Sequence, residues 1–219
     1  MKKPAWSHSS LKDFEGCARR YHEVKVLKNY PFQDTEQTRY GKQLHKAAED
    51  YIKDDTPLPE QFAFVQPTLD SLKAKTGRKF VEYEMGLTED LNPCAFDSEN
   101  VWVRGIADLL VVNGDKAFIV DYKTGSNKYP DLKQLQLMAL MTFAHFPEVQ
   151  TIHAGLLFVM HKHFITDSYT RDRLDDYWKD FWWNLERLHN SHVTDTWQPN
   201  PTPLCGWCPV KTCEYHKEK

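Results

Sequence analysis

The sequence predicts an α/β fold in which a mixed central sheet is flanked by helices. The first 75 residues place apolar side chains at helical spacing. Beyond Gly77, four segments are rich in β-branched and aromatic residues, and a helical segment lies between the third and the fourth of them. Helices followed by the order β, β, β, α, β are typical of a mixed sheet with helices around it.

The helical part at the start of the chain is expected to contain three helices. Ser9 or Ser10 would cap a first helix that runs to Tyr21. Apolar residues at helical spacing predict a second helix at 38–53. A Pro-Leu-Pro stretch then breaks the helix, and a third helix is expected at 62–75.

The strands and the helix among them make up the predicted core. Asn113-Gly114-Asp115, between the second and third strands, is a hairpin signal. A helix is expected at 132–146. The expected strands are 79–87, 101–112, 117–122 and 152–159.

A last amphipathic helix is expected at 171–189. Its apolar stripe contains several aromatic residues, whose spacing favours packing in the core over a platform for stacking nucleobases. The stripe consists of Leu174, Tyr177, Trp178, Phe181, Trp182, Leu185 and Leu188.

The composition is that of a globular protein with one sizeable core. The chain has 219 residues, of which 41% are hydrophobic and 27% charged. We therefore expect a single domain over 1–219, with a helical part at 1–76, a core at 77–170 and a C-terminal part at 171–219. No apolar run approaches the length needed to cross a bilayer, and no apolar segment follows the N-terminal lysines. We therefore expect a cytoplasmic protein (in the host cytoplasm, if the protein is viral) without a membrane partner.

The residues that carry chemistry lie on the second and third strands, which bring one aspartate each toward the same region. Asp121 and Lys123 are two residues apart on an extended chain, so they share a face, and Asp108 lies on the strand before the hairpin. Carboxylate oxygens bind Mg²⁺ or Mn²⁺, which can activate water and stabilise negative charge on a phosphodiester. A lysine beside such an ion can orient or deprotonate the water. The net charge of −3 means that a nucleic-acid partner would need a local basic groove beside these acidic residues.

These residues lie within two motifs. Gly105-Ile-Ala-Asp108 followed by Asp121-Tyr-Lys-Thr-Gly125 resembles motifs II and III of the PD-(D/E)XK nucleases. It is similar in particular to the RecB-like branch, which includes CRISPR-associated and phage exonucleases. The resemblance implies a restriction-endonuclease-like core.

Three more segments extend this resemblance. Gly41-Lys-Gln-Leu-His45 resembles the Gly-x-x-x-His helix motif of the branch, and Val81-Glu82-Tyr-Glu84 resembles its early strand with a catalytic glutamate. Gln134-Leu-Gln-Leu-Met138 resembles its Gln-x-x-x-Tyr motif, but methionine replaces the tyrosine at Met138. Glu82 and Glu84 are expected on the same side of their strand, so only the resemblance favours Glu82.

The resemblance implies a role for each of these residues. His45, Asp108, Asp121 and the carbonyl of Tyr122 would bind Mg²⁺ or Mn²⁺. Glu82 would be a nearby metal or water ligand, and Lys123 would activate or position the attacking water. Gln134 would belong to the same catalytic group.

The function that the resemblance implies is hydrolysis of DNA. We expect a metal-dependent deoxyribonuclease, specifically an exonuclease acting on DNA ends or single strands in phage recombination, repair or replication. A structure-specific endonuclease and a non-catalytic DNA-binding module on the same fold remain alternatives. A homo-oligomer, or a recombination or replication protein as partner, is also open. Basic residues that could contact phosphates are Lys42, Lys46, Lys128 and Lys133.

Cysteines near the C-terminus predict a second metal centre. Cys205, Cys208 and Cys213 lie within nine residues, and a Cys-x2-Cys pair in a reducing compartment favours a metal over a disulfide. Cys17 is the candidate fourth ligand. One cysteine before the core and three after it resemble the iron–sulfur nucleases of the RecB-like branch, in which a [4Fe–4S] cluster ties the chain ends together.

Zinc is the alternative cofactor for these cysteines. His216 follows Cys213 by three residues, so Cys205, Cys208, Cys213 and His216 could form a local Zn²⁺ site. Cys94 is expected in a loop after Pro93 and is interpreted as structural.

Overall fold

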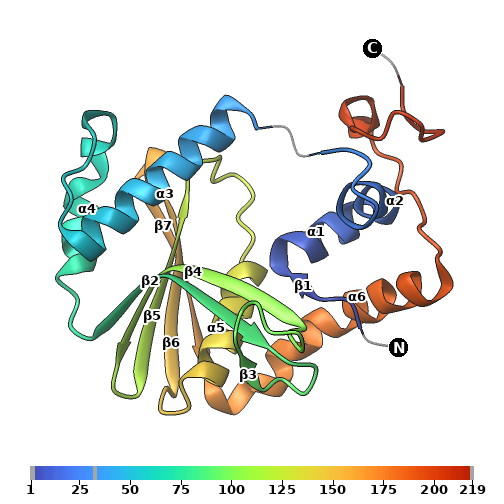
Figure 1. Ribbon diagram of the computed structural model, residues 1–219. Coiled ribbons are helices and arrows are strands. Elements are labelled where there is room, and N and C mark those ends of the chain that lie inside the picture. Colours follow the sequence, from blue (N-terminus) through green and yellow to red (C-terminus); the bar gives the residue numbers. More distant parts are fainter. Residues whose placement is uncertain (1–2, 32–33, 218–219) are drawn as a thin grey trace. The chain divides into compact units, whose positions relative to one another are not determined.

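A computed structural model describes residues 3–31 and 34–217 (Figure 1). The chain forms two compact units, one of residues 34–177 and one of residues 1–33 with 178–219. The boundary falls inside one helix, α6 (Leu174–Thr194). The prediction of a single domain over 1–219 stays a prediction, and each unit is described by itself.

A mixed sheet forms the centre of the unit 34–177, as predicted. Its strand order is β3-β2-β4-β5-β6-β7. β5 and β6 are parallel and are joined through helix α5 (Lys133–His145), while the other neighbouring pairs are antiparallel. The strands are β2 (Arg78–Leu87), β3 (Pro93–Cys94), β4 (Val103–Asn113), β5 (Lys116–Lys123), β6 (Thr151–Phe158) and β7 (His163–Thr170).

Strands β4 and β5 separate before β5 ends. Their pairing runs from Asn113↔Lys116 to Leu109↔Val120 and stops there. β5 continues to pair with β6 as far as Lys123↔Phe158, and β4 continues to pair with β2. The last three residues of β5 therefore have a neighbour on one side only, and this leaves room for side chains between β4 and β5.

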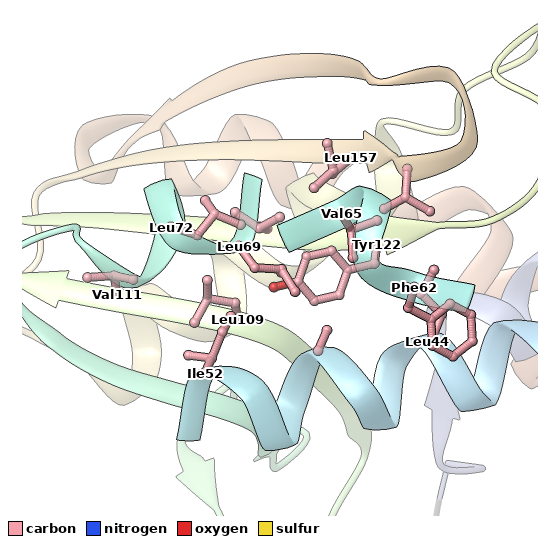
Figure 2. Packing of buried hydrophobic residues seen from close by; sticks show 13 residues of the cluster. Leu44, Ile52, Phe62, Val65, Leu69, Leu72, Leu109, Val111, Tyr122 and Leu157 are labelled. Carbon is pink, nitrogen blue, oxygen red and sulfur yellow. The ribbon is translucent and has the colours of Figure 1, made fainter. Parts of the chain in front are cut away.

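Helices α3 (Glu36–Asp54) and α4 (Gln66–Lys73), with the 3-10 helix η2 (Glu60–Val65), cover one face of the sheet. Thr35 caps α3 by accepting from the backbone N–H of Thr38, and the left-handed backbone of Asp55 ends the helix. The hydrophobic core under these helices is shown in Figure 2. It consists of Leu44, Ala48, Ile52, Phe62, Val65, Leu69, Leu72, Leu109, Val111, Val120, Tyr122, Leu157 and Val159.

The alternation of side chains along β2 is interrupted at Glu82. Val81 packs on the core under α3, whereas Tyr83 packs on His145 and Phe146 at the end of α5. A regular strand would place both residues on one face, because its side chains alternate with a period of two. Glu82 between them has a φ of 48°, in the left-handed region. Its backbone therefore reverses the alternation at the point where β2 passes the candidate site.

The unit that contains both chain ends is built from short helices and one long one. It comprises β1 (Trp6–Ser7), α1 (His8–Gly16), α2 (Ala18–Tyr21), the π-helix η1 (His22–Val26), most of α6, and the 3-10 helix η5 (Pro203–Trp207). The Asn184 side chain donates to Glu15 at 2.6 Å, and the rings of Trp6 and Phe181 lie 6.0 Å apart. α6 thus contacts α1 through a hydrogen bond and β1 through an aromatic pair.

Several sequence predictions need correction. Ser7, rather than Ser9 or Ser10, caps the first helix, because its hydroxyl accepts from the N–H of Ser10. That helix breaks at Cys17, which has an extended backbone. The predicted helix at 62–75 begins as a 3-10 helix.

The remaining corrections concern strands and the long helix. Strand β7 was not expected, and Cys94 lies in the short strand β3 instead of a loop. On the apolar stripe of α6, Trp182 is 40% exposed, so its assignment to the core was wrong. Its ring stacks on that of Trp178 at 5.7 Å. No helix among residues 3–31 and 34–217 is long and apolar enough to cross a membrane.

Candidate metal centre and cysteine pocket

Helix α3 carries His45 to the end of β5. The neighbouring Leu44 and the next-turn residue Ala48 are buried in the core, which fixes the rotation of the helix about its axis. Gly41 lies one turn before His45, and a Cβ atom added there would lie 3.2 Å from Oγ1 of Thr124. The absence of a side chain at Gly41 thus permits a close approach between α3 and the residue that follows β5.

The two ring nitrogens of His45 have different partners. Nε2 lies 3.0 Å from the carbonyl oxygen of Tyr122, which can only accept, so Nε2 carries the hydrogen and donates. Nδ1 lies 3.4 Å from Oδ1 of Asp108 and 3.9 Å from Oε1 of Glu82. A neutral imidazole would point its Nδ1 lone pair at two carboxylates. A proton or a metal cation at Nδ1 would remove that repulsion.

The pKa of His45 reflects these neighbours. Burial by itself lowers the pKa, but the hydrogen bond and the charge of Asp108, with the charges of Asp121 and Glu82, raise it above the ordinary histidine value. The surrounding carboxylates therefore favour a positive charge on or beside the ring.

Asp108 is buried and accepts a hydrogen bond from the backbone. Its Oδ2 receives the N–H of Tyr122 at 2.7 Å, across the gap where β4 and β5 no longer pair. Its Oδ1 faces His45. The separation of the strands thus gives a backbone donor of β5 to the carboxylate rather than to β4, and orients that carboxylate.

Asp121, Lys123 and Gln134 form a second connected group. Nζ of Lys123 lies 2.7 Å from Oδ2 of Asp121 and donates to Oε1 of Gln134 at 2.7 Å. The Gln134 amide also donates to Oδ1 of Asp121. Lys123 thus contacts both Asp121 and Gln134, and the three side chains form one connected group.

Burial raises the pKa of Asp121 above the usual aspartate range, and the charge of Asp108 raises it further. Lys123 and His45 act in the opposite direction. The net upward shift shows that this carboxylate has less compensating positive charge than it needs.

Glu82 completes the acidic group. Burial and the charge of Asp108 raise its pKa to about 7. Glu84, two residues further along β2, is exposed. The structure therefore distinguishes two glutamates that are equivalent by strand spacing, because the left-handed backbone at Glu82 brings its side chain to His45.

Ligand atoms of His45, Glu82 and Asp108 all lie within 4.8 Å of one another. Two hard carboxylates and an imidazole suit a divalent cation, and such a cation would offset the negative charge that raises the pKa values. Asp121 is close enough to this group for the charges of Asp108 and His45 to shift its pKa. The residues present thus fit a divalent metal ion.

The remaining predicted residues are Met138 and the four lysines that could contact phosphates. Met138 is buried, and its side chain packs at Gly105 of β4. Nζ of Lys42 contacts Asp34 at 3.1 Å, and that of Lys46 contacts Asp50 at 2.6 Å. Lys128 and Lys133 are exposed.

The four predicted cysteine ligands line one pocket in the unit of the chain ends. Cys17, Cys205, Cys208 and Cys213 surround it together with His216. The sulfur of Cys17 accepts from the backbone N–H of Asn200 at 3.4 Å, and that of Cys205 from the N–H of Thr202 at 3.3 Å. Cys94 lies in the other unit, in β3. The structure thus brings the cysteine of the N-terminal segment to the three of the C-terminal segment.

The spacing of these sulfurs bears on the kind of metal. A tetrahedral zinc site with Zn–S bonds of about 2.3 Å places its sulfurs about 3.8 Å apart. Among the described residues, no three of the cysteine and histidine ligand atoms in this pocket lie within 4.8 Å of one another. Each thiolate of a [4Fe–4S] cluster binds a different iron, so a cluster holds its thiolates farther apart than a single ion does. Thiolates are ligands in both kinds of centre, so the four cysteines form a candidate metal site.

Comparison with known families agrees with this arrangement. A family model described as the PD-(D/E)XK nuclease superfamily matches residues 5–72 and 61–213. These ranges cover well over half of the chain. The chain belongs to the PD-(D/E)XK nuclease superfamily. Membership confirms the predicted family and fold class, while the RecB-like branch stays a prediction.

Solved structures support the PD-(D/E)XK fold. A crystal structure of a “Putative exonuclease” from Eubacterium rectale is similar with a TM-score of 0.56 at 13% identity, over 100% of this chain and 91% of that one. The structure of SSO0001 covers 98% of this chain and 87% of its own at 12% identity, but its TM-score of 0.47 carries no argument. No curated protein matches the chain. At these identities the first likeness shows the fold alone.

Sequence reasoning missed two parts of these sites. The backbone N–H of Tyr122 as the donor to Asp108 has no signal in the sequence, since it depends on where β4 and β5 separate. Arg19 and Arg20 line the cysteine pocket. Their position two and three residues after Cys17 is a signal that could have found them, because residues near a ligand on a short helix share its surroundings.

Proposed function

We propose that this PD-(D/E)XK nuclease is a Mg²⁺- or Mn²⁺-dependent DNA exonuclease that acts on DNA ends or single strands. The observation that carries the proposal is the group of His45, Glu82 and Asp108, whose ligand atoms lie within 4.8 Å of one another, beside strand β5 with Asp121 and Lys123. An acidic metal site beside a lysine is what hydrolysis of a phosphodiester requires.

His45, Glu82 and Asp108 would hold the ion, and Asp121 and the carbonyl of Tyr122 are the further predicted ligands. A bound divalent ion supplies Lewis-acid stabilisation of charge on the phosphate and lowers the pKa of a bound water. The chain itself orients the ligands, because the N–H of Tyr122 holds Asp108 and the carbonyl of Tyr122 holds His45.

Lys123 would act on the attacking water or on the charge that develops at the phosphate. Its ammonium group is held between Asp121 and Gln134, so its position does not depend on substrate. Gln134 is a positioning residue in this proposal. It donates to Asp121 and accepts from Lys123, and thereby fixes both side chains relative to each other.

The test is degradation of end-labelled linear DNA with Mg²⁺ or Mn²⁺. We expect wild type to degrade it, and Lys123→Ala and Asp121→Ala to be inactive with intact folding. Glu82→Ala and Glu84→Ala form a matched pair on one strand, and only the first should lose activity because Glu84 is exposed.

Circular single-stranded DNA has no ends, so its cleavage would show an endonuclease. DNA binding without cleavage by wild type would support a non-catalytic module.

We further propose that Cys17, Cys205, Cys208 and Cys213 bind a [4Fe–4S] cluster that ties the two chain ends of this unit together. Support comes from the shared pocket and from the two N–H···S hydrogen bonds to Cys17 and Cys205. Anaerobically purified protein should then contain iron and acid-labile sulfide and absorb visible light. Cys213→Ser should lose both, and Cys94→Ser should keep both. Stoichiometric zinc without iron would support the alternative site with His216.

A role in phage recombination, repair or replication, a cytoplasmic location and a homo-oligomeric or protein-bound state stay predictions. Gel filtration with light scattering tests the oligomeric state.

A further inference from the structure

Two loops leave the sheet at the edge where the candidate metal centre lies. β5 and β6 are parallel and end together at the pair Lys123↔Phe158. The segments that follow them, residues 124–132 and 159–162, therefore start side by side. Each carries exposed apolar and basic side chains, which are Lys128 and Tyr129 on the first, and Met160 and Lys162 on the second.

The loop 124–132 is closed at its base by the catalytic candidates. Lys123 precedes it, Gln134 follows it closely, and these two side chains are hydrogen-bonded at 2.7 Å. Tyr129 is five residues from Gln134, so an extended chain would place it at most about 18 Å away. Whatever contacts the tip of this loop is therefore held within a few nucleotides of a phosphate at the metal centre.

Tyr129 is suited to bind a flat ring. Its side chain is 82% exposed, and Nζ of Lys128 lies 5.2 Å from the centre of its ring. An aromatic face with a cation beside it is the combination with which proteins bind single-stranded nucleic acid, in which bases stack and phosphates meet lysines.

The neighbouring loop offers a second apolar contact. Met160 is 50% exposed, and its sulfur accepts from the hydroxyl of Tyr40 at 3.5 Å. Tyr40 lies on α3, five residues before His45, so this contact ties the loop beside the helix of the metal centre. Val159 is buried in the core and anchors the start of the loop.

We propose that Tyr129 stacks on an unpaired nucleobase within a few nucleotides of the scissile phosphate, with Met160 as a second apolar contact and Lys128 and Lys162 at the flanking phosphates. In a duplex the faces of the bases are stacked on one another, so only an unpaired strand can offer a face to Tyr129. The substrate would then be single-stranded DNA or a single-stranded overhang. This inference rests on the proposed nuclease function and adds the strand preference to it.

The test compares Tyr129→Ala with Tyr129→Phe, since phenylalanine keeps the ring and removes the hydroxyl. Single-stranded oligonucleotides carry the fluorescent base 2-aminopurine at one of the four terminal positions, and Ca²⁺ replaces Mg²⁺, with gels to verify that the strand stays intact. We expect fluorescence quenching at one position with wild type and Tyr129→Phe, and none with Tyr129→Ala. Affinity for single strands should fall about 10-fold or more in Tyr129→Ala and less than about 2-fold on blunt duplex.

Cleavage by wild type, measured in parallel with Mg²⁺, separates this inference from the proposed function. If wild type cleaves DNA and Tyr129→Ala binds and cleaves single strands as wild type does, the stacking role is overturned while the nuclease stands. An equal loss in Tyr129→Phe, or an equal loss on blunt duplex, also overturns it. A further outcome is that wild type cleaves no DNA while 2-aminopurine is quenched by wild type and Tyr129→Phe and not by Tyr129→Ala. In that case the nuclease proposal fails and the contact with single strands stands.

Discussion

The two metal-binding candidates are held in different ways. The group of His45, Glu82 and Asp108 comes from a long helix and two paired strands whose neighbouring residues fill the hydrophobic core. The four cysteines come from a helix break, a 3-10 helix and turns. Packing therefore orients the first group without an ion, whereas we expect the second to depend on the proposed cluster. The predictions below test that difference, from the largest expected effect to the smallest.

Asp108→Asn should abolish activity and leave the fold intact. The amide keeps the shape and can still accept the N–H of Tyr122, but it removes a charge from the metal centre. We expect kcat/KM to fall by about 10³-fold, which is about 4 kcal/mol of transition-state stabilisation. Thermal unfolding should be unchanged or raised in the metal-free protein, because carboxylate repulsion is relieved. A large drop in Tm would contradict packing as the source of order at this site.

Cys208→Ser, unlike Asp108→Asn, should lower the stability of the protein. Loss of a ligand is expected to destabilise the unit of the chain ends by on the order of 3 kcal/mol. Near-UV circular dichroism reports this through the buried Trp6 and Trp178 of that unit. Cys94→Ser in β3 is the matched control and should change stability little. An unchanged melting curve in Cys208→Ser would show that this pocket is also ordered by packing alone.

The stability of the metal-free protein should fall as the pH rises from about 5 to 8. The pKa of Glu82 is raised from 4.5 to about 7, and those of Asp121 and His45 are raised as well. A carboxyl group with a raised pKa holds its proton in the folded state above the pH at which the unfolded state releases it. Stability is therefore lost between the two pKa values. A histidine with a raised pKa stabilises the folded state at pH values below its pKa in the unfolded state. This stabilisation is lost as the pH rises through its pKa in the folded state, so His45 acts in the same direction as the carboxyl groups.

The matched variants for this pH prediction are Glu82→Gln and Glu84→Gln. The unfolding of each variant by urea is measured at pH 5 and at pH 8 in the presence of EDTA. Glu82→Gln should reduce the difference in unfolding free energy between pH 5 and pH 8 by about 1 kcal/mol. This value is reduced for the partial exposure of the side chain. Glu84→Gln should leave the slope unchanged. Mn²⁺ should flatten it in wild type, because a cation replaces the missing positive charge. A slope of opposite sign would show that the carboxylates are better compensated than their surroundings indicate.

Gly41→Ala tests how tightly α3 approaches the residue after β5. A Cβ atom would lie 3.2 Å from Oγ1 of Thr124, which opposes the gain of about 0.5–1 kcal/mol that alanine brings to a helix interior. We expect a net stability change below about 1 kcal/mol and a few-fold loss of activity from displacement of His45. Combining it with Thr124→Ala should release the contact and recover the helical gain. No recovery would show that the close approach does not limit the position of α3.

Local patterns predicted most of the elements. The helices α3 and α5 and the strands β2, β4, β5 and β6 lie where periodicity and the Asn113-Gly114 turn indicated, because each buries a continuous apolar face. Strand β7 was missed because its residues are mostly exposed, so alternation was weak. The break at Cys17 was missed because apolar spacing continues through it to Ala18 and Tyr21.

By itself the sequence determined the family and most of the elements, and it identified His45, Asp108 and Asp121 as candidate ligands, since these depend on local spacing and on motifs. Only the tertiary structure decided that Glu82 rather than Glu84 faces His45, because a left-handed backbone residue within a strand leaves no mark in the pattern of apolar residues. It also decided that Asp108 takes a backbone donor from β5, and that Cys17 joins three cysteines about 190 residues away. These are contacts between distant segments, and they exist only where packing and strand register bring the segments together.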